Sequence, residues 1–159
     1  MKGFALLAVS LLLAGAWVWG PVLAADKPPA DAAAIWTYIT KTSPYAKWKV
    51  WPDYAGMQKA RSPHGAQNKV FVNPIGFGAK KPPMPYGTIQ VKESFNKGGK
   101  LLNIAIMYKS KGYNPAAGDW FWALYSPSGE VLRAGKHKGC IGCHGVKADN
   151  DYVTTHTFK

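Results

Sequence analysis

The sequence predicts a mainly β fold (α+β): an antiparallel sheet preceded by a short N-terminal helix and followed by a C-terminal segment that carries both cysteines. Short runs of β-branched and aromatic residues, each broken by Pro or Gly, fill the middle of the chain, which is the pattern of strands joined by tight turns. Long segments with apolar residues at a period of 3.6 are missing, which argues against a helix bundle. Two of the junctions between runs have hairpin composition, and hairpins make a sheet antiparallel.

The N-terminus has the layout of an export signal. Lys2 provides a basic start, residues 4–20 are apolar, and short side chains precede and include Ala24, as a signal peptidase requires. A membrane span is the competing interpretation, because the apolar run approaches the roughly 20 residues that a bilayer needs. The polar residues directly after Ala24 favour cleavage there. We therefore expect residues 1–24 to be a signal peptide and the protein to be periplasmic.

A linker and a short helix are expected next. Residues 25–34 are rich in Pro and Ala, as linkers often are, and lead into a single domain of residues 35–159. An amphipathic helix is expected over residues 32–41, because Ile35 and Ile39 fall on one helical face. It overlaps the end of the linker. This helix is expected to lie over the domain as a lid.

The strands follow in sequence order. Two connections, residues 96–100 and 126–130, have the Gly, Asn, Pro and Ser content of hairpin loops, so the runs that flank each of them are expected to pair. The predicted strands are residues 69–73, 88–95, 101–108 and 119–125, with a further short run at 131–135.

The composition is that of one compact globular domain. Of 159 residues, 47% are apolar and 18% are charged, which supplies enough apolar side chains for a core. Lys and Arg number 20 against 8 Asp and Glu, a formal net charge of +12. A surface of this kind suits an acidic redox protein or an anionic lipid surface as partner. An exported chain is expected to have no nucleic-acid partner.

Cys140, Cys143 and His144 form a C-x-x-C-H motif, the attachment signature of c-type haem. Two thiols three positions apart can form thioethers with the two vinyl groups of haem, and the next residue then presents its imidazole to the iron. The motif predicts one covalently attached haem c, with His144 as the proximal ligand of the iron.

Two other interpretations of the motif remain open. A thioredoxin-like redox pair needs a βαβ unit around it, and the sequence predicts none. A zinc site needs a fourth ligand, which His137 or His156 would have to provide.

The sixth ligand of the iron is a separate question, because only fifteen residues follow His144 and none of them is Met. The upstream candidates also have ordinary explanations as core or loop residues. We therefore expect a five-coordinate iron with an open distal side. These candidates are Met57, Met84, Met107 and His64.

Several short motifs, together with the C-terminal C-x-x-C-H, resemble those of the cytochrome P-460 family, which includes cytochrome c′-beta. The resemblance covers roughly residues 35–158. It implies a single haem c held against an antiparallel sheet, His144 as axial ligand, a homodimer, and small nitrogen-oxide ligands such as nitric oxide or hydroxylamine. The motifs are SPHG at 62–65, GTIQVKE at 87–93, GY at 112–113, GDWFW at 118–122 and DYV at 151–153.

Lys92 decides between two branches of this family. In the hydroxylamine-oxidising members that the sequence resembles, a lysine at the matching place is covalently linked to the haem edge. Strand alternation puts Gln90, Lys92 and Ser94 on one face of the strand and Glu93 on the other. A lysine beside haem is desolvated, which lowers its pKa and makes its amine a nucleophile. Lys92 is therefore a candidate haem-binding and catalytic residue, with an ordinary solvated side chain as the alternative.

The sequence departs from the oxidising members on the next strand. Those members carry a Glu on the strand that matches residues 101–108, and oxidation of hydroxylamine must remove protons, for which a pocket carboxylate is suited. No acid is present in this run here. An apolar distal pocket that admits a small neutral gas is therefore favoured, with Phe71 as a haem contact. The candidate cap residues, for which core packing is the alternative, are Phe71, Phe95, Ile104 and Ile106.

Three functions follow from these observations. The preferred one is a five-coordinate haem protein that binds or detoxifies nitric oxide. The second is an enzyme that oxidises hydroxylamine, with Lys92 joined to the haem. The third is a low-spin electron-transfer cytochrome c. The sequence does not decide whether the protein is an enzyme.

Overall fold

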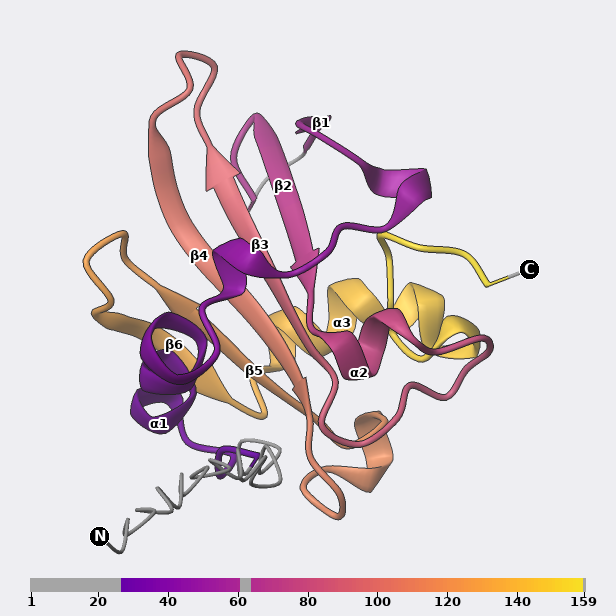
Figure 1. Ribbon diagram of the computed structural model, residues 1–159. Helices are drawn as coiled ribbons and strands as arrows, with labels where there is room; N and C mark the ends of the chain where they lie inside the picture. Colours follow the sequence, from indigo (N-terminus) through magenta and orange to yellow (C-terminus); the bar gives the residue numbers. More distant parts are fainter. Residues whose placement is uncertain (1–26, 61–63, 159) are drawn as a thin grey trace, which may run out of the picture.

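The computed structural model describes residues 27–60 and 64–158 (Figure 1). The predicted signal peptide, residues 1–24, lies outside them. Within the described residues, six antiparallel strands form one sheet in sequence order, which confirms the mainly β fold with an N-terminal helix. The strands are β1 (Gln58–Lys59), β2 (Gln67–Val72), β3 (Ile89–Phe95), β4 (Leu101–Lys109), β5 (Trp120–Tyr125) and β6 (Val131–Gly135).

The helices are short and lie on both sides of the sheet, with α1 on one side and α3 on the other (Figure 1). None of those in the described ranges is long and apolar enough to span a bilayer. The α-helices are α1 (Ala32–Thr37), α2 (Pro74–Phe77) and α3 (Lys138–His144). A π-helical turn, Tyr38–Thr42, extends α1, and 3-10 helices cover Tyr45–Lys47, Pro52–Tyr54, Pro115–Ala117 and Gly145–Asn150.

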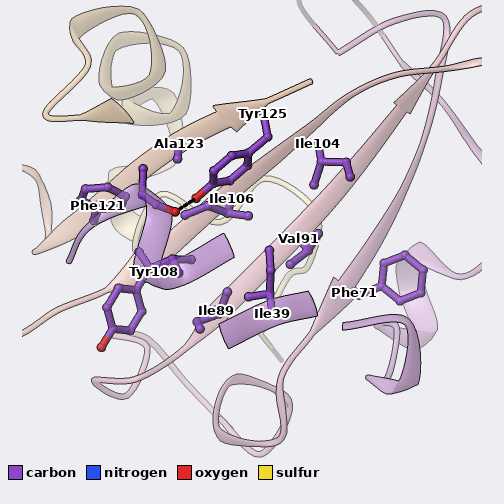
Figure 2. Packing of buried hydrophobic residues seen from close by; sticks show 12 residues of the cluster. Ile39, Phe71, Ile89, Val91, Ile104, Ile106, Tyr108, Phe121, Ala123 and Tyr125 are labelled. Carbon is purple, nitrogen blue, oxygen red and sulfur yellow. Dashed lines mark hydrogen bonds between the residues drawn. The ribbon is translucent and has the colours of Figure 1, made fainter. Parts of the chain in front are cut away.

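Helix α1 begins where the sequence provides a cap. The carboxylate of Asp31 accepts a hydrogen bond from the backbone N–H of Ala34 at 2.9 Å, which satisfies one of the free donors of the first turn. Ile35 in α1 and Ile39 in the π-helical turn that extends it lie four residues apart, and both are fully buried against the sheet. The Tyr125 hydroxyl donates to the carbonyl of Ala32 at 2.8 Å (Figure 2). The helix is therefore part of the core.

The segment before α1 also contacts the sheet. The hydroxyl of Tyr108, in β4, donates to the carbonyl of Pro28 at 2.8 Å. The predicted linker therefore contacts the domain that follows it, through Pro28, Ala30 and Ala32.

Both faces of the sheet are covered, so the strands carry apolar residues on each side. We call these the α1 face and the α3 face, after the helix on each. On the α1 face, side chains of β2 to β5 pack with α1 (Figure 2). On the α3 face a second cluster includes Val72, Met84, Met107, Trp51, Trp120, Trp122 and Val153, with Cys140 and Ile141 of α3 against it.

The α1-face core should contribute strongly to the stability of the fold. We expect Ile39→Ala to lower the free energy of unfolding by about 2–5 kcal/mol, because the side chain is fully buried and its loss leaves a cavity. Urea unfolding measures this. Leu102→Ala is the control, since this side chain is 41% exposed, and its effect should stay within about 0.5 kcal/mol. Equal losses of stability in both variants would contradict the contribution assigned to the buried Ile39 side chain.

Candidate functional site

The α3 face contains a cavity of about 370 Å³ between the sheet and α3. Cys140, Cys143 and His144 of the C-x-x-C-H motif line it, together with residues from β2 to β6 and from the C-terminal segment. The remaining lining residues are His64, Val70, Gln90, Lys92, Ala105, Ile106, Met107, Trp122, Ala123, Leu124, Arg133, His137, Gly139, Thr154 and Thr155.

Helix α3 brings the motif to one side. Residues three and four apart lie on the same face of a helix, so Cys140, Cys143 and His144 point the same way. Both thiols are free. The Cys140 sulfur lies 3.6 Å from Nδ1 of His137, the residue that precedes the helix. Burial raises the pKa of the Cys140 thiol above its usual value.

His144 is held in the form that binds a metal. Its Nδ1 lies 2.9 Å from the carbonyl oxygen of Tyr152, and a carbonyl only accepts, so Nδ1 carries the proton and donates. Nε2 is then left with its lone pair. Burial lowers the pKa of His144 to about 4, which keeps the ring neutral. The ring also packs against Trp122 at a centroid distance of 4.7 Å.

Lys92 lies in the same cavity, in the middle of β3. Its register partners are Val70 on β2 and Ala105 on β4, and both of these also line the cavity. Burial lowers the pKa of Lys92 from 10.5 to about 8, since water no longer solvates the ammonium. The structure thus brings Lys92 together with the C-x-x-C-H residues.

Besides His137 and His144, a third imidazole lines the cavity, that of His64. Its ring centroid lies 6.4 Å from that of His144, and the two ring planes are nearly perpendicular, at 88°. Burial is the main cause that lowers the pKa of His64 to about 3, followed by the electrostatic cost of charging this ring close to Lys92 and to His144. The ring is therefore neutral.

The three Met candidates for an iron ligand lie in different places. Met84 is buried in the α3-face cluster without lining the cavity, and Met57 is 48% exposed. Met107 does line the cavity, while it also packs in the α3-face cluster.

The structure does not bring Phe71 to the cavity. Phe71 pairs with Val91, and both point to the α1 face (Figure 2). There the Phe71 ring meets the Tyr45 ring edge-on, with the two ring centroids 5.4 Å apart. Its neighbour Val70 lines the cavity instead. The expected cap by Phe71 is therefore corrected to a core position. Ile104 likewise belongs to the α1-face core.

Several lining residues were not predicted from the sequence. Arg133, Thr154 and Thr155 reach the cavity from β6 and from the C-terminal segment. Only the pairing of β5 with β6 could have indicated Arg133, because its partner Leu124 also faces the cavity.

No Asp or Glu is present among the described residues that line the cavity. Glu93 is adjacent to Lys92 in β3, but its carboxylate accepts a hydrogen bond from the Tyr45 hydroxyl at 2.8 Å, in contact with the segment that follows α1. The alternation predicted for this strand therefore separates the acid from the lysine.

The cavity walls have polar atoms that need a partner. His64 Nδ1, Gln90 Nε2 and Trp122 Nε1 are buried without a hydrogen-bond partner in the protein, and buried polar groups are nearly always satisfied in native proteins. Among the described residues no three His, Cys, Asp or Glu side chains converge to hold a metal ion by themselves. A bound group with its own polar atoms and one imidazole ligand fits this donor set.

These residues define a haem-binding protein. Two thiols and a neutral imidazole on one helix face a largely apolar cavity, as a haem with a protein-held iron requires. Comparison with protein-family models identifies the family: residues 42–155 match Cytochrome P460, and the chain belongs to that family. The protein is thus a cytochrome that binds haem. A comparison with curated proteins finds no match.

The buried Lys92 makes the stability of the haem-free protein depend on pH. The lysine has a pKa of about 8 in the fold and 10.5 in the unfolded chain. Between these values the unfolded state binds more protons, so stability rises with pH. Relative to Lys92→Met, the wild-type free energy of unfolding should increase by about 3 kcal/mol from about pH 7 to about pH 11. Urea unfolding at each pH tests this, and a constant difference would refute it.

Proposed function

We propose that the protein is a periplasmic mono-haem c cytochrome whose five-coordinate iron binds nitric oxide. Cys140 and Cys143 would hold the haem through thioethers, and His144 would be its iron ligand through Nε2. The haem supplies the iron site at which the gas binds. The chain's own residues exclude water with the apolar wall of the cavity, and Tyr152 holds the proton of His144 at Nδ1.

The observation that carries this proposal is the lack of a carboxylate among the described cavity residues. Oxidation of hydroxylamine removes protons together with electrons, and a positioned carboxylate is suited to accept them. Ala105, the partner of Lys92 on the next strand, offers a methyl group in the cavity. Binding of a neutral gas requires no proton acceptor.

Hydroxylamine oxidation with a Lys92–haem link is the alternative. Its support is the place of Lys92 in the cavity and its pKa of about 8, which leaves a usable fraction of neutral amine.

A low-spin electron carrier is a second candidate, favoured by His64. Two imidazole rings on opposite sides of one metal ion, with metal–nitrogen bonds of about 2 Å, have centroids roughly 6 Å apart. The 6.4 Å between His64 and His144 is close to this separation. His64 as sixth ligand would give such a carrier.

The expected partners rest on charge and on the family. The formal net charge of +12 suits an acidic redox protein as electron partner. Homodimerisation is proposed from the family, and periplasmic export from the leader-like residues 1–24.

Absorption spectra of the purified holoprotein test the function. We expect a high-spin ferric spectrum, one nitric oxide bound per ferrous haem, and no reduction of an electron acceptor in the presence of hydroxylamine. A low-spin ferric spectrum would instead support the carrier with His64. A strongly red-shifted Soret band with hydroxylamine turnover would support the enzyme.

A matched pair of variants tests whether the missing carboxylate is what prevents hydroxylamine oxidation in the proposed function. Ala105→Glu places a carboxylate beside Lys92, whereas Leu102→Glu adds the same charge on an exposed part of β4. Hydroxylamine-dependent acceptor reduction should appear in Ala105→Glu and not in Leu102→Glu. No activity in either variant would show that the missing carboxylate is not what limits oxidation.

Haem attachment is tested by mass spectrometry of the denatured holoprotein. The wild type and the single variants Cys140→Ala and Cys143→Ala should retain haem, with one thioether in each variant, and the double variant should lose it. Release of haem from the wild-type protein on denaturation would contradict covalent attachment. Haem that stays on the double variant would reveal a bond to Lys92.

A further inference from the structure

The turn that follows the 3-10 helix after α3 has an unusual backbone. Asp151 and Tyr152 have φ of 52° and 65°, so two consecutive residues with side chains occupy the left-handed region. Each such residue costs free energy, and the conformation persists only where surrounding contacts impose it. The contacts that impose it here are found on Asp151.

Asp151 forms a buried ion pair with Lys109, the last residue of β4. The lysine Nζ lies 2.6 Å from both carboxylate oxygens, and both residues are buried. The backbone N–H of Met84 donates to the same carboxylate at 2.7 Å. The Trp120 indole N–H donates to the Asp151 carbonyl at 2.9 Å. The side chain and the carbonyl of Asp151 are thus fixed by three separate parts of the sheet and its loops.

The backbone carbonyl of Tyr152, the residue after Asp151, orients His144, the proposed iron ligand. The carbonyl of Tyr152 accepts from Nδ1 of His144 at 2.9 Å, and the Tyr152 N–H donates to the carbonyl of Lys147 at 2.8 Å. Because Tyr152 adjoins Asp151 in the left-handed turn, the direction of its carbonyl depends on where Asp151 is held.

We propose that the Lys109–Asp151 pair positions His144, the proposed ligand of the haem iron. It acts through the backbone of Tyr152 by setting the hydrogen bond on His144 Nδ1, and a stronger hydrogen bond there makes the imidazole a better electron donor to its metal. This inference rests on the proposed role of His144 as iron ligand. Lys109 and Asp151 are positioning residues that do not line the cavity.

The reduction potential of the holoprotein tests whether the Lys109–Asp151 pair acts on His144. Asp151→Asn and Lys109→Met both break the pair, so both should weaken the His144 hydrogen bond and raise the potential. The iron–histidine stretching frequency of the ferrous protein should fall in both. A charge effect alone would move the two potentials in opposite directions, because one variant removes a negative charge and the other a positive one.

Asp53→Asn is the control variant. Asp53 pairs with His156 at 2.7 Å in the C-terminal segment, and neither residue contacts the 151–152 turn through a hydrogen bond in the structure. The reduction potential of the Asp53→Asn variant should equal that of the wild type. Unchanged potential and stretching frequency in the Lys109 and Asp151 variants, with lower thermal stability, would show that the pair is only structural and overturn the proposal.

A double variant keeps the test decisive if a single change prevents folding. Lys109→Met with Asp151→Leu removes both buried charges at once, which proteins tolerate better than one unpaired charge. It should show the same higher potential and lower frequency, and a wild-type potential in this variant would overturn the inference. A wild-type holoprotein whose spectra show no imidazole ligand would refute the role of His144 instead, which separates the two failures.

Discussion

A buried ion pair between Lys109 and Asp151 joins the sheet to the segment whose backbone accepts a hydrogen bond from His144. Removal of one partner from such a pair leaves an unpaired buried charge and typically costs about 3–5 kcal/mol. Through Met84 and Trp120, the same Asp151 also ties the loop before β3 and the strand β5 to this turn. The helix with the C-x-x-C-H motif, which bonds to this turn through His144 and Tyr152, is thereby tied to the sheet.

The division of the sheet into two faces decides which residues take part in chemistry. On the α1 face, Ile89 and Val91 pack into an ordinary core, whereas on the α3 face Gln90 and Lys92 of the same strand reach the cavity. The buried α1-face core therefore supports a site built from alternate residues of the strands. This arrangement places few polar groups in the cavity while keeping their positions fixed.

Local pattern was enough to predict the strands and the orientation of Lys92, because alternation acts within one strand. The run 88–95 corresponds to β3, and the acid at Glu93 does point away from the cavity lysine. The role of Phe71 could not be predicted in this way, since its face follows from its pairing with Val91 on another strand. Register between strands is a long-range property, and the two-residue β1 is too short to have a pattern at all.

One register position separates two kinds of chemistry in this cavity. A carboxylate at the place of Ala105 would accept protons, but it would also stabilise the ammonium of Lys92 and raise its pKa. With a methyl group there, desolvation dominates and the lysine pKa falls to about 8. In the proposed function, the lack of an acid among the described cavity residues leaves no carboxylate to accept the protons of hydroxylamine, while it favours a nucleophilic amine at Lys92. A covalent link between Lys92 and haem, if found, would therefore not by itself imply that the protein oxidises hydroxylamine.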